Sequence, residues 1–151
     1  MSGPLDAARW TLVLCGAVVA ADQASKALVE ALMARGERVE VLPFLAIENT
    51  RNRGVAFGLF SDVSPLLVAA TVVGLVAVLV FLAANVRRPL IWLPAGLLLG
   101  GALGNLADRV RIDSVVDFVD LPAWPTFNLA DVAIVAGVLA LLLLPQRAPE
   151  R

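Results

Sequence analysis

The composition of this 151-residue chain is too apolar for a soluble domain of its size. Apolar residues make up 60% and charged residues 17%, whereas soluble domains average about 45–50% and about 25%. The absence of histidine excludes a Ser–His triad and a His-ligated metal, and the single cysteine, Cys15, excludes an internal disulfide. The net charge of −1 gives no reason to expect a nucleic-acid partner. We therefore expect an integral membrane protein whose acid–base chemistry relies on Asp, Glu, Lys or Arg.

Four apolar segments are long enough, or nearly so, to span a bilayer as helices, for which about 20 residues are needed. The predicted helices cover residues 10–33, 65–85, 90–108 and 128–145. We expect the whole chain, residues 1–151, to form a single, all-α membrane domain. In the third helix Gly96, Gly100 and Gly104 recur at a spacing of four, with Gly101 beside them. Small residues at this spacing let membrane helices approach closely, so we interpret them as a packing surface, within the bundle or between copies.

The connections between the predicted helices are unequal in length. Residues 34–64 and 109–127 form long connections, and segments 39–42, 44–47 and 115–120 have strand-like patterns that predict a small β-sheet there. The other connection is a tight turn that contains Arg87 and Arg88. Arginines close to membrane ends favour the cytoplasmic side. We therefore expect both termini in the cytoplasm and the sheet and long loops outside it.

Polar residues gather at the outer ends of three predicted helices and in both long loops. They are Asp22, Lys26, Asn52, Arg53, Gly54, Asn105, Asp108, Arg109, Asp117, Asn128 and Asp131. Polar groups at membrane depth are costly and usually face a bundle interior or a water-filled cavity, so their convergence indicates a functional site. Two neighbouring carboxylates can share one proton and act as acid and base. Such a pair would hydrolyse a peptide bond without histidine, serine or metal, and the residues alone leave open which two aspartates form it.

Most of these residues also have a structural explanation. Asn128 can cap the last helix, with Asp131 three residues later completing a capping box, and capping and function are equally supported for this pair. Asp22 and Lys26, at i and i+4, favour an ion pair. Asn105 and Asp108 could form a solvated helix end with Arg109 as the counter-ion. Asp117 is harder to explain structurally, because it is flanked by apolar residues.

Three other classes of protein also fit parts of this pattern. A small membrane transporter or channel subunit would bury Asp and Lys, but it would more often have helices broken at mid-membrane. A Mg-dependent membrane phosphotransferase could use an aspartate cluster and would lose activity in chelator. A non-enzymatic scaffold would tolerate Asp117→Asn.

Five short motifs occur in order between Asp22 and Asp131. They are Asp22-Gln23-Ala24-Ser25-Lys26, Asn52-Arg53-Gly54-Val55-Ala56-Phe57, Asn105-Leu106-Ala107-Asp108-Arg109, Val115-Val116-Asp117-Phe118 and Phe127-Asn128-Leu129-Ala130-Asp131. With this ordered set the chain resembles the lipoprotein signal peptidase family, also called signal peptidase II, of bacterial inner membranes. One departure is Asp113-Ser114, where the family often has glycine, and it makes the local turn geometry uncertain.

The resemblance implies a membrane aspartyl endopeptidase with four transmembrane helices, a small extracytoplasmic sheet and an active site at the extracytoplasmic face. It implies that Asp117 and Asp131 are the catalytic pair. It also implies substrate-binding or supporting roles for Asp22, Lys26, Asn52, Gly54, Asn105, Asp108, Arg109, Asn128 and Ala130. The substrates would be prolipoproteins cleaved before a cysteine that carries diacylglycerol. Membrane lipids are the other expected partners, and neither a cofactor nor a metal is implied. The helix N-terminus favours an ionised Asp131, and apolar neighbours favour a protonated Asp117.

Overall fold

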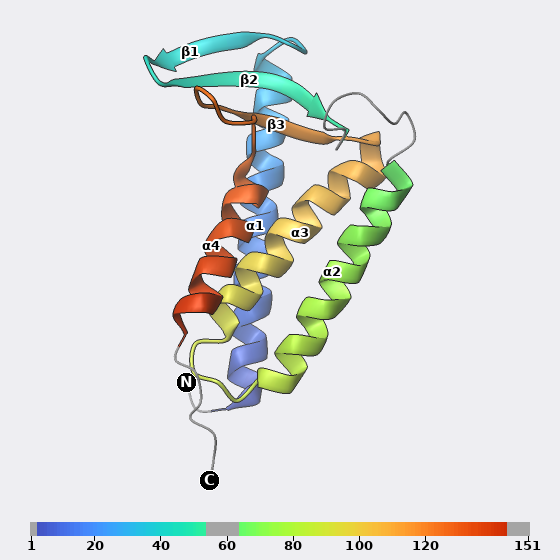
Figure 1. The fold of residues 1–151 in the computed structure, drawn as a ribbon, viewed down its shortest axis with the longest axis vertical. Coiled ribbons are helices and arrows are strands. Elements are labelled where there is room, and N and C mark those ends of the chain that lie inside the picture. Colours follow the sequence, from blue (N-terminus) through green and yellow to red (C-terminus); the bar gives the residue numbers. More distant parts are fainter. Residues whose placement is uncertain (1–2, 54–63, 145–151) are drawn as a thin grey trace.

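The computed structural model describes residues 3–53 and 64–144, which form four helices and one three-stranded sheet (Figure 1). In chain order the elements are α1 (Pro4–Leu32), β1 (Arg38–Leu42), β2 (Leu45–Asn52), α2 (Ser64–Asn85), α3 (Trp92–Ile112), β3 (Val115–Asp120) and α4 (Leu129–Leu143). The sheet lies across one end of the helix bundle, and the start of α1 and the end of α4 lie at the opposite end (Figure 1).

Two helices extend beyond the ranges expected from the apolar segments. Helix α1 begins at Pro4 rather than near residue 10, because proline is well suited to a first turn, where its missing N–H needs no partner. Helix α3 continues past residue 108 to Ile112 and ends where Asp113 adopts a left-handed conformation, with φ 53° and ψ 23°. Glycine is the usual residue in that conformation, and aspartate is one of the few others that tolerate it. The helix end at Asp113 thus has an ordinary geometry despite the missing glycine.

The sheet is antiparallel with the strand order β1–β2–β3. Strand β2 is longer than expected, and Asn52, which the sequence placed in a loop, is its last residue and pairs with Val115 of β3. After β3 the chain turns back, and Phe127 bridges to Val119. This bridge brings the residue that follows it, Asn128, back beside β3.

Helix α3 is the centre of the bundle and packs against α1, α2 and α4 (Figure 1). Its glycines Gly96, Gly100 and Gly104 face α1, and a Cβ atom on Gly100 would lie 2.6 Å from Cβ of Val18. Gly101 faces α4, where a Cβ atom would meet Ile134 at 2.8 Å. The glycine stripe therefore serves close packing inside the bundle.

The bundle has the polarity of a protein that lies in lipid. Its largest fully buried side chains include Lys26, Asp22, Asp108 and Asn128, whereas many leucines and valines are exposed on the helices. In soluble proteins charged side chains are mostly exposed and large apolar side chains are mostly buried. By length and hydropathy, α1 is the one helix within the described ranges that qualifies to cross a bilayer, and the apolar stretches Ala69–Asn85 and Leu129–Leu143 are shorter.

Candidate active site

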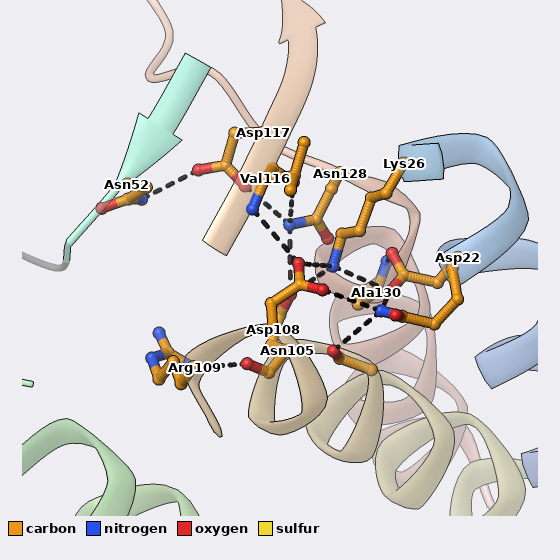
Figure 2. Close-up of polar contacts among 12 residues, drawn as sticks. Asp22, Lys26, Asn52, Asn105, Asp108, Arg109, Val116, Asp117, Asn128 and Ala130 are labelled. Carbon is orange, nitrogen blue, oxygen red and sulfur yellow. Dashed lines mark hydrogen bonds and ion pairs between the residues drawn. The ribbon is translucent and has the colours of Figure 1, made fainter. Parts of the chain in front are cut away.

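The polar residues predicted from the sequence converge where the ends of α1, α3 and α4 meet β2 and β3 (Figure 2). The predicted site residues inside the described ranges are Asp22, Lys26, Asn52, Asn105, Asp108, Arg109, Asp117, Asn128, Ala130 and Asp131. Gly54 lies outside those ranges.

Lys26 is the centre of a fully buried charge cluster. Its ammonium nitrogen lies 2.8 Å from Oδ2 of Asp22 and 2.9 Å from Oδ2 of Asp108, and it donates to Oδ1 of Asn105 at 3.0 Å. The side chains of Lys26, Asp22 and Asp108 have no exposed surface. An ammonium group has three donors, so all of them are used. The predicted Asp22–Lys26 pair is confirmed, and it is part of a larger cluster that joins α1 to α3.

The two carboxylates of the cluster also hold the backbone of the neighbouring elements. Asp22 accepts the backbone N–H of Ala130 at 3.0 Å, and Asp108 accepts that of Val116 at 3.2 Å. Gln23, whose role the sequence did not predict, donates to Oδ1 of Asp108 at 3.0 Å. The cluster thus fixes the first turn of α4 and the start of β3 relative to α1 and α3.

Asn105 connects this cluster to Asp131. Its Oδ1 accepts from Lys26, so its amide nitrogen must point the other way, where it donates to Oδ1 of Asp131 at 2.8 Å. An amide oxygen cannot donate to a carboxylate and an amide nitrogen cannot accept from an ammonium group. Lys26 therefore determines which end of Asn105 faces Asp131.

Asn128 bridges the two candidate catalytic aspartates, and Figure 2 shows it beside Asp117. Its Oδ1 accepts the backbone N–H of Asp131 at 3.0 Å, and the carboxylate of Asp131 accepts the backbone N–H of Asn128 at 3.2 Å, which completes a capping box at the start of α4. The amide nitrogen of Asn128 donates to Oδ1 of Asp117 at 2.6 Å. Capping, one of the two explanations that the sequence left open, is confirmed, and the same side chain also contacts Asp117.

Asp117 lies on β3, and 2% of its surface is exposed. The amide nitrogen of Asn52 donates to its Oδ2 at 2.9 Å, so each oxygen of this carboxylate has an amide donor. The pKa of Asp117 is raised to about 6, mainly by burial and in part by the charge of Asp131, while the amides of Asn52 and Asn128 oppose the rise. Asp117 therefore holds a proton in a pH range where an ordinary aspartate is ionised.

Asn105 and Asp108 are buried and do not form a solvated helix end, and Arg109 is not the counter-ion of Asp108. Among the described residues Asp108 is paired with Lys26 and Arg111, whereas Arg109 donates to the backbone oxygen of Asn105 at 3.5 Å. The length of α3 explains why Arg111 and not Arg109 pairs with Asp108. Because the helix continues past residue 108, Arg111 lies at i+3 on the same face as Asp108.

A second charged cluster, which the sequence did not predict, lies beside the first. Glu30 near the end of α1 pairs with Arg51 of β2 and with Arg111 of α3. Arg51 precedes Asn52 in the chain, so this pairing helps to hold the end of β2 against β3. No sequence signal marks these residues as partners, since they come from three elements that are distant along the chain.

The arrangement provides two carboxyl groups in different environments that share Asn128. Asp117 is buried, whereas Asp131 is partly exposed at the first turn of a helix. Such differences separate the proton affinities of two carboxyl groups and allow one to act as an acid and the other as a base.

A helix bundle with a small sheet over its polar end is also the fold of a bacterial membrane enzyme. A structure of such an enzyme, determined by the in meso method at 1.9 Å resolution, matches this chain with a TM-score of 0.82 and 33% identity and covers 88% of this chain and 90% of that one. A family model described as signal peptidase (SPase) II matches residues 14–145. The chain belongs to the signal peptidase II family.

Relatives named lipoprotein signal peptidase agree with this assignment. The chain is 44% identical over 131 residues to a lipoprotein signal peptidase of Pelotomaculum thermopropionicum, covering 85% of this chain and 86% of that protein. It is 45% identical over 141 residues to the lipoprotein signal peptidase of Moorella thermoacetica, covering 89% of this chain and 93% of that protein.

Proposed function

We propose that Asp117 and Asp131 are the catalytic pair with which this chain, an aspartic peptidase of the signal peptidase II family, removes the signal peptide from prolipoproteins. The observation that carries the proposal is the bridging position of Asn128, which orients both carboxylates. The cleaved bond precedes a cysteine that already carries diacylglycerol.

The two carboxyl groups have complementary tasks. Asp131, which accepts hydrogen bonds from Asn105 and the backbone of Asn128, is the ionised partner and removes a proton from a water molecule. The resulting hydroxide attacks the scissile carbonyl carbon while protonated Asp117 donates its proton to the carbonyl oxygen. As the tetrahedral intermediate collapses, the proton held by Asp131 passes to the amine of the leaving cysteine and the carbonyl re-forms by returning its proton to Asp117. Both aspartates then have their starting charges.

The neighbouring residues support this pair without taking part in proton transfer. Asn52 and Asn128 hold Asp117, and Asn105 holds Asp131. Asp22, Lys26 and Asp108 fix Asn105 and the first turn of α4. Arg109, Ala130 and Gly54 are proposed to contact the substrate or to support the backbone that faces it. No feature of the site favours the transporter or phosphotransferase alternatives over this function.

We propose that all four helices cross the membrane as a single domain, with the sheet at the extracytoplasmic face and both termini in the cytoplasm. Exposed apolar residues on α1, α2 and α4, among them Leu12, Val73 and Leu142, support contact with lipid. Arg87 and Arg88 lie at the end of the bundle opposite the sheet, which agrees with a cytoplasmic position for that end (Figure 1). A diacylglyceryl group anchored in the outer leaflet would then lie beside the site.

Separate Asp117→Asn and Asp131→Asn variants test the catalytic assignment. Each should insert and fold, yet fail to cleave a lipidated precursor in reconstituted vesicles, because asparagine can neither accept nor donate the catalytic proton. Asp120→Asn is the matched control, since Asp120 lies on the same strand as Asp117 but pairs with Arg38 at the far end. Full cleavage by either of the first two variants would show that the pair is wrongly assigned. Cleavage that is lost in chelator would instead favour a metal-dependent reaction.

A further inference from the structure

A cavity of about 340 Å³ lies at the end of the bundle opposite the sheet, far from the catalytic aspartates. It is formed by the first turn of α1, the turn between α2 and α3, and the start of α3. Arg87 and Arg88 line it, together with Trp92. The proposed peptidase reaction uses none of these residues.

An apolar groove of about 290 Å³ continues from this cavity toward the middle of the bundle. The cavity and the groove share Ala7 and Val86 in their walls, so the two spaces adjoin. The groove follows α1 to Leu12 and α2 to Leu79, a length of about 10 Å along α2 at the helical rise. Leu12 and Leu79 are exposed on the outer surface of the helices, so the groove is open to the surrounding lipid.

The cavity is lined by an indole ring as well as by positive charge. The indole nitrogen of Trp92 is buried and has no acceptor among the described residues. The ring of Trp92 lies beside that of Trp10, with 6.2 Å between centroids. In membrane proteins tryptophan side chains are enriched at the depth of the lipid headgroups. The arginines and the indole ring line the cavity and only apolar residues and Thr11 line the groove, so a charged headgroup suits the cavity and an acyl chain suits the groove.

We propose that this composite space binds one phospholipid with an anionic headgroup. Arg87 and Arg88 bind the phosphate and headgroup, the ring of Trp92 packs against the glycerol region, and the start of one acyl chain fills the groove beside Leu79. Basic pockets between membrane helices are known to hold anionic headgroups on the cytoplasmic side. The rival occupant is the start of a bound signal peptide, but that segment carries positive charge and both arginines would repel it.

Fluorescence quenching by brominated lipids tests the proposal on the full-length protein. The chain has three tryptophans, so Trp124→Phe leaves only Trp10 and Trp92, which adjoin the site. This protein is placed in phosphatidylcholine bilayers that contain, as a minor component, either brominated phosphatidylglycerol or brominated phosphatidylcholine. Each arginine near the headgroup should enrich the anionic lipid about five-fold, so phosphatidylglycerol should quench more strongly at equal bromine content.

Arg88→Gln and Arg9→Gln, each made in this background, separate the site from general surface charge. Arg9 is an exposed arginine at the same end of α1 and does not line the cavity. Arg88→Gln should reduce the preference for phosphatidylglycerol about five-fold, and Arg9→Gln should leave it unchanged. Unaltered precursor cleavage by both variants in pure phosphatidylcholine shows that they are folded. Ala83→Phe, which fills the groove without changing charge, should also lower quenching by phosphatidylglycerol.

Four results would overturn the proposal. Equal quenching by the two lipids would mean that only non-specific surrounding lipid is present. An equal effect of Arg9→Gln and Arg88→Gln would mean that the membrane surface, and not the cavity, attracts the anionic lipid. No effect of Ala83→Phe would mean that no acyl chain enters the groove. Relief of quenching by an added precursor would identify the signal peptide as the occupant.

Discussion

Lys26→Met is expected to destabilise the fold severely, because it removes the only cation that contacts both Asp22 and Asp108 among the described residues. The three side chains have no exposed surface, and the ammonium nitrogen lies 2.8 Å and 2.9 Å from the two carboxylates. Removing one partner from a buried ion pair leaves an uncompensated charge and costs about 3–5 kcal/mol. Methionine has a similar length, so the loss comes from charge and hydrogen bonding and not from an empty space.

The matched control is Arg38→Met. Arg38 also contacts two carboxylates, those of Asp120 at 2.7 Å and Glu40 at 3.1 Å, but 46% of its side chain is exposed. Exposed ion pairs add little to stability, because water and salt screen their charges. The free energy of unfolding of both variants can be measured by SDS titration in mixed micelles, followed by circular dichroism.

A third variant shows whether charge is the cause. Adding Asp22→Asn and Asp108→Asn to Lys26→Met removes the uncompensated charges and should recover much of the lost stability. A loss of stability in Lys26→Met no larger than that in Arg38→Met would refute the argument. So would a triple variant that is less stable than Lys26→Met alone.

The remaining predictions concern Asp117 and the packing of α3. The pKa of Asp117 is raised to about 6, with burial as the largest cause, so kcat/KM should fall as pH rises above about 6. The Asn52 amide opposes this rise of the pKa, so Asn52→Leu should move the fall in kcat/KM to higher pH. The pKa of Asp117 is higher in the folded protein than its ordinary value, so protonation of Asp117 stabilises the fold at low pH. This contribution to the free energy of unfolding is lost as pH rises through about 6, and Asp117→Asn should abolish that pH dependence. Gly100→Ala should cost about 1–3 kcal/mol in the same SDS titration, because its Cβ would lie 2.6 Å from Val18. Gly74→Ala, with nothing within 4 Å, should instead stabilise by up to about 1 kcal/mol, and equal effects at the two glycines would contradict the packing described for α3.

Local patterns in the sequence predicted the parts of the site that depend on local geometry. Asp22 and Lys26 lie one helical turn apart, so their pairing follows from spacing within α1 alone. The capping box of Asn128 and Asp131 follows from spacing in the same way. The third member of the charge cluster, Asp108, could not be paired with Lys26 from spacing, because that contact depends on how closely α1 and α3 approach.

Where the sequence interpretation failed, a long-range contact decided the structure. Residues 48–52 are all polar, and the sequence placed them in a loop, yet they belong to β2, and residues 50–52 pair with β3, which makes Asn52 a strand residue. Strand formation depends on such neighbours more than on intrinsic preference. The predicted end of α3 near residue 108 likewise concealed Arg111 as the partner of Asp108.

The pairing of charges within single helices has a consequence for how the protein is assembled. Asp22 has Lys26 one turn away on α1, and Asp108 has Arg111 one turn away on α3. Each helix can therefore enter the membrane during synthesis with its acid already neutralised, before any partner helix has been made. Lys26 acquires Asp108 only when α1 and α3 dock, and the proposed catalytic pair is complete only when α4 brings Asp131 and Asn128. With Asp117 and Asp131 as the proposed pair, we expect proteolytic activity to begin with the last helix and a partly synthesised chain in the membrane to be inactive.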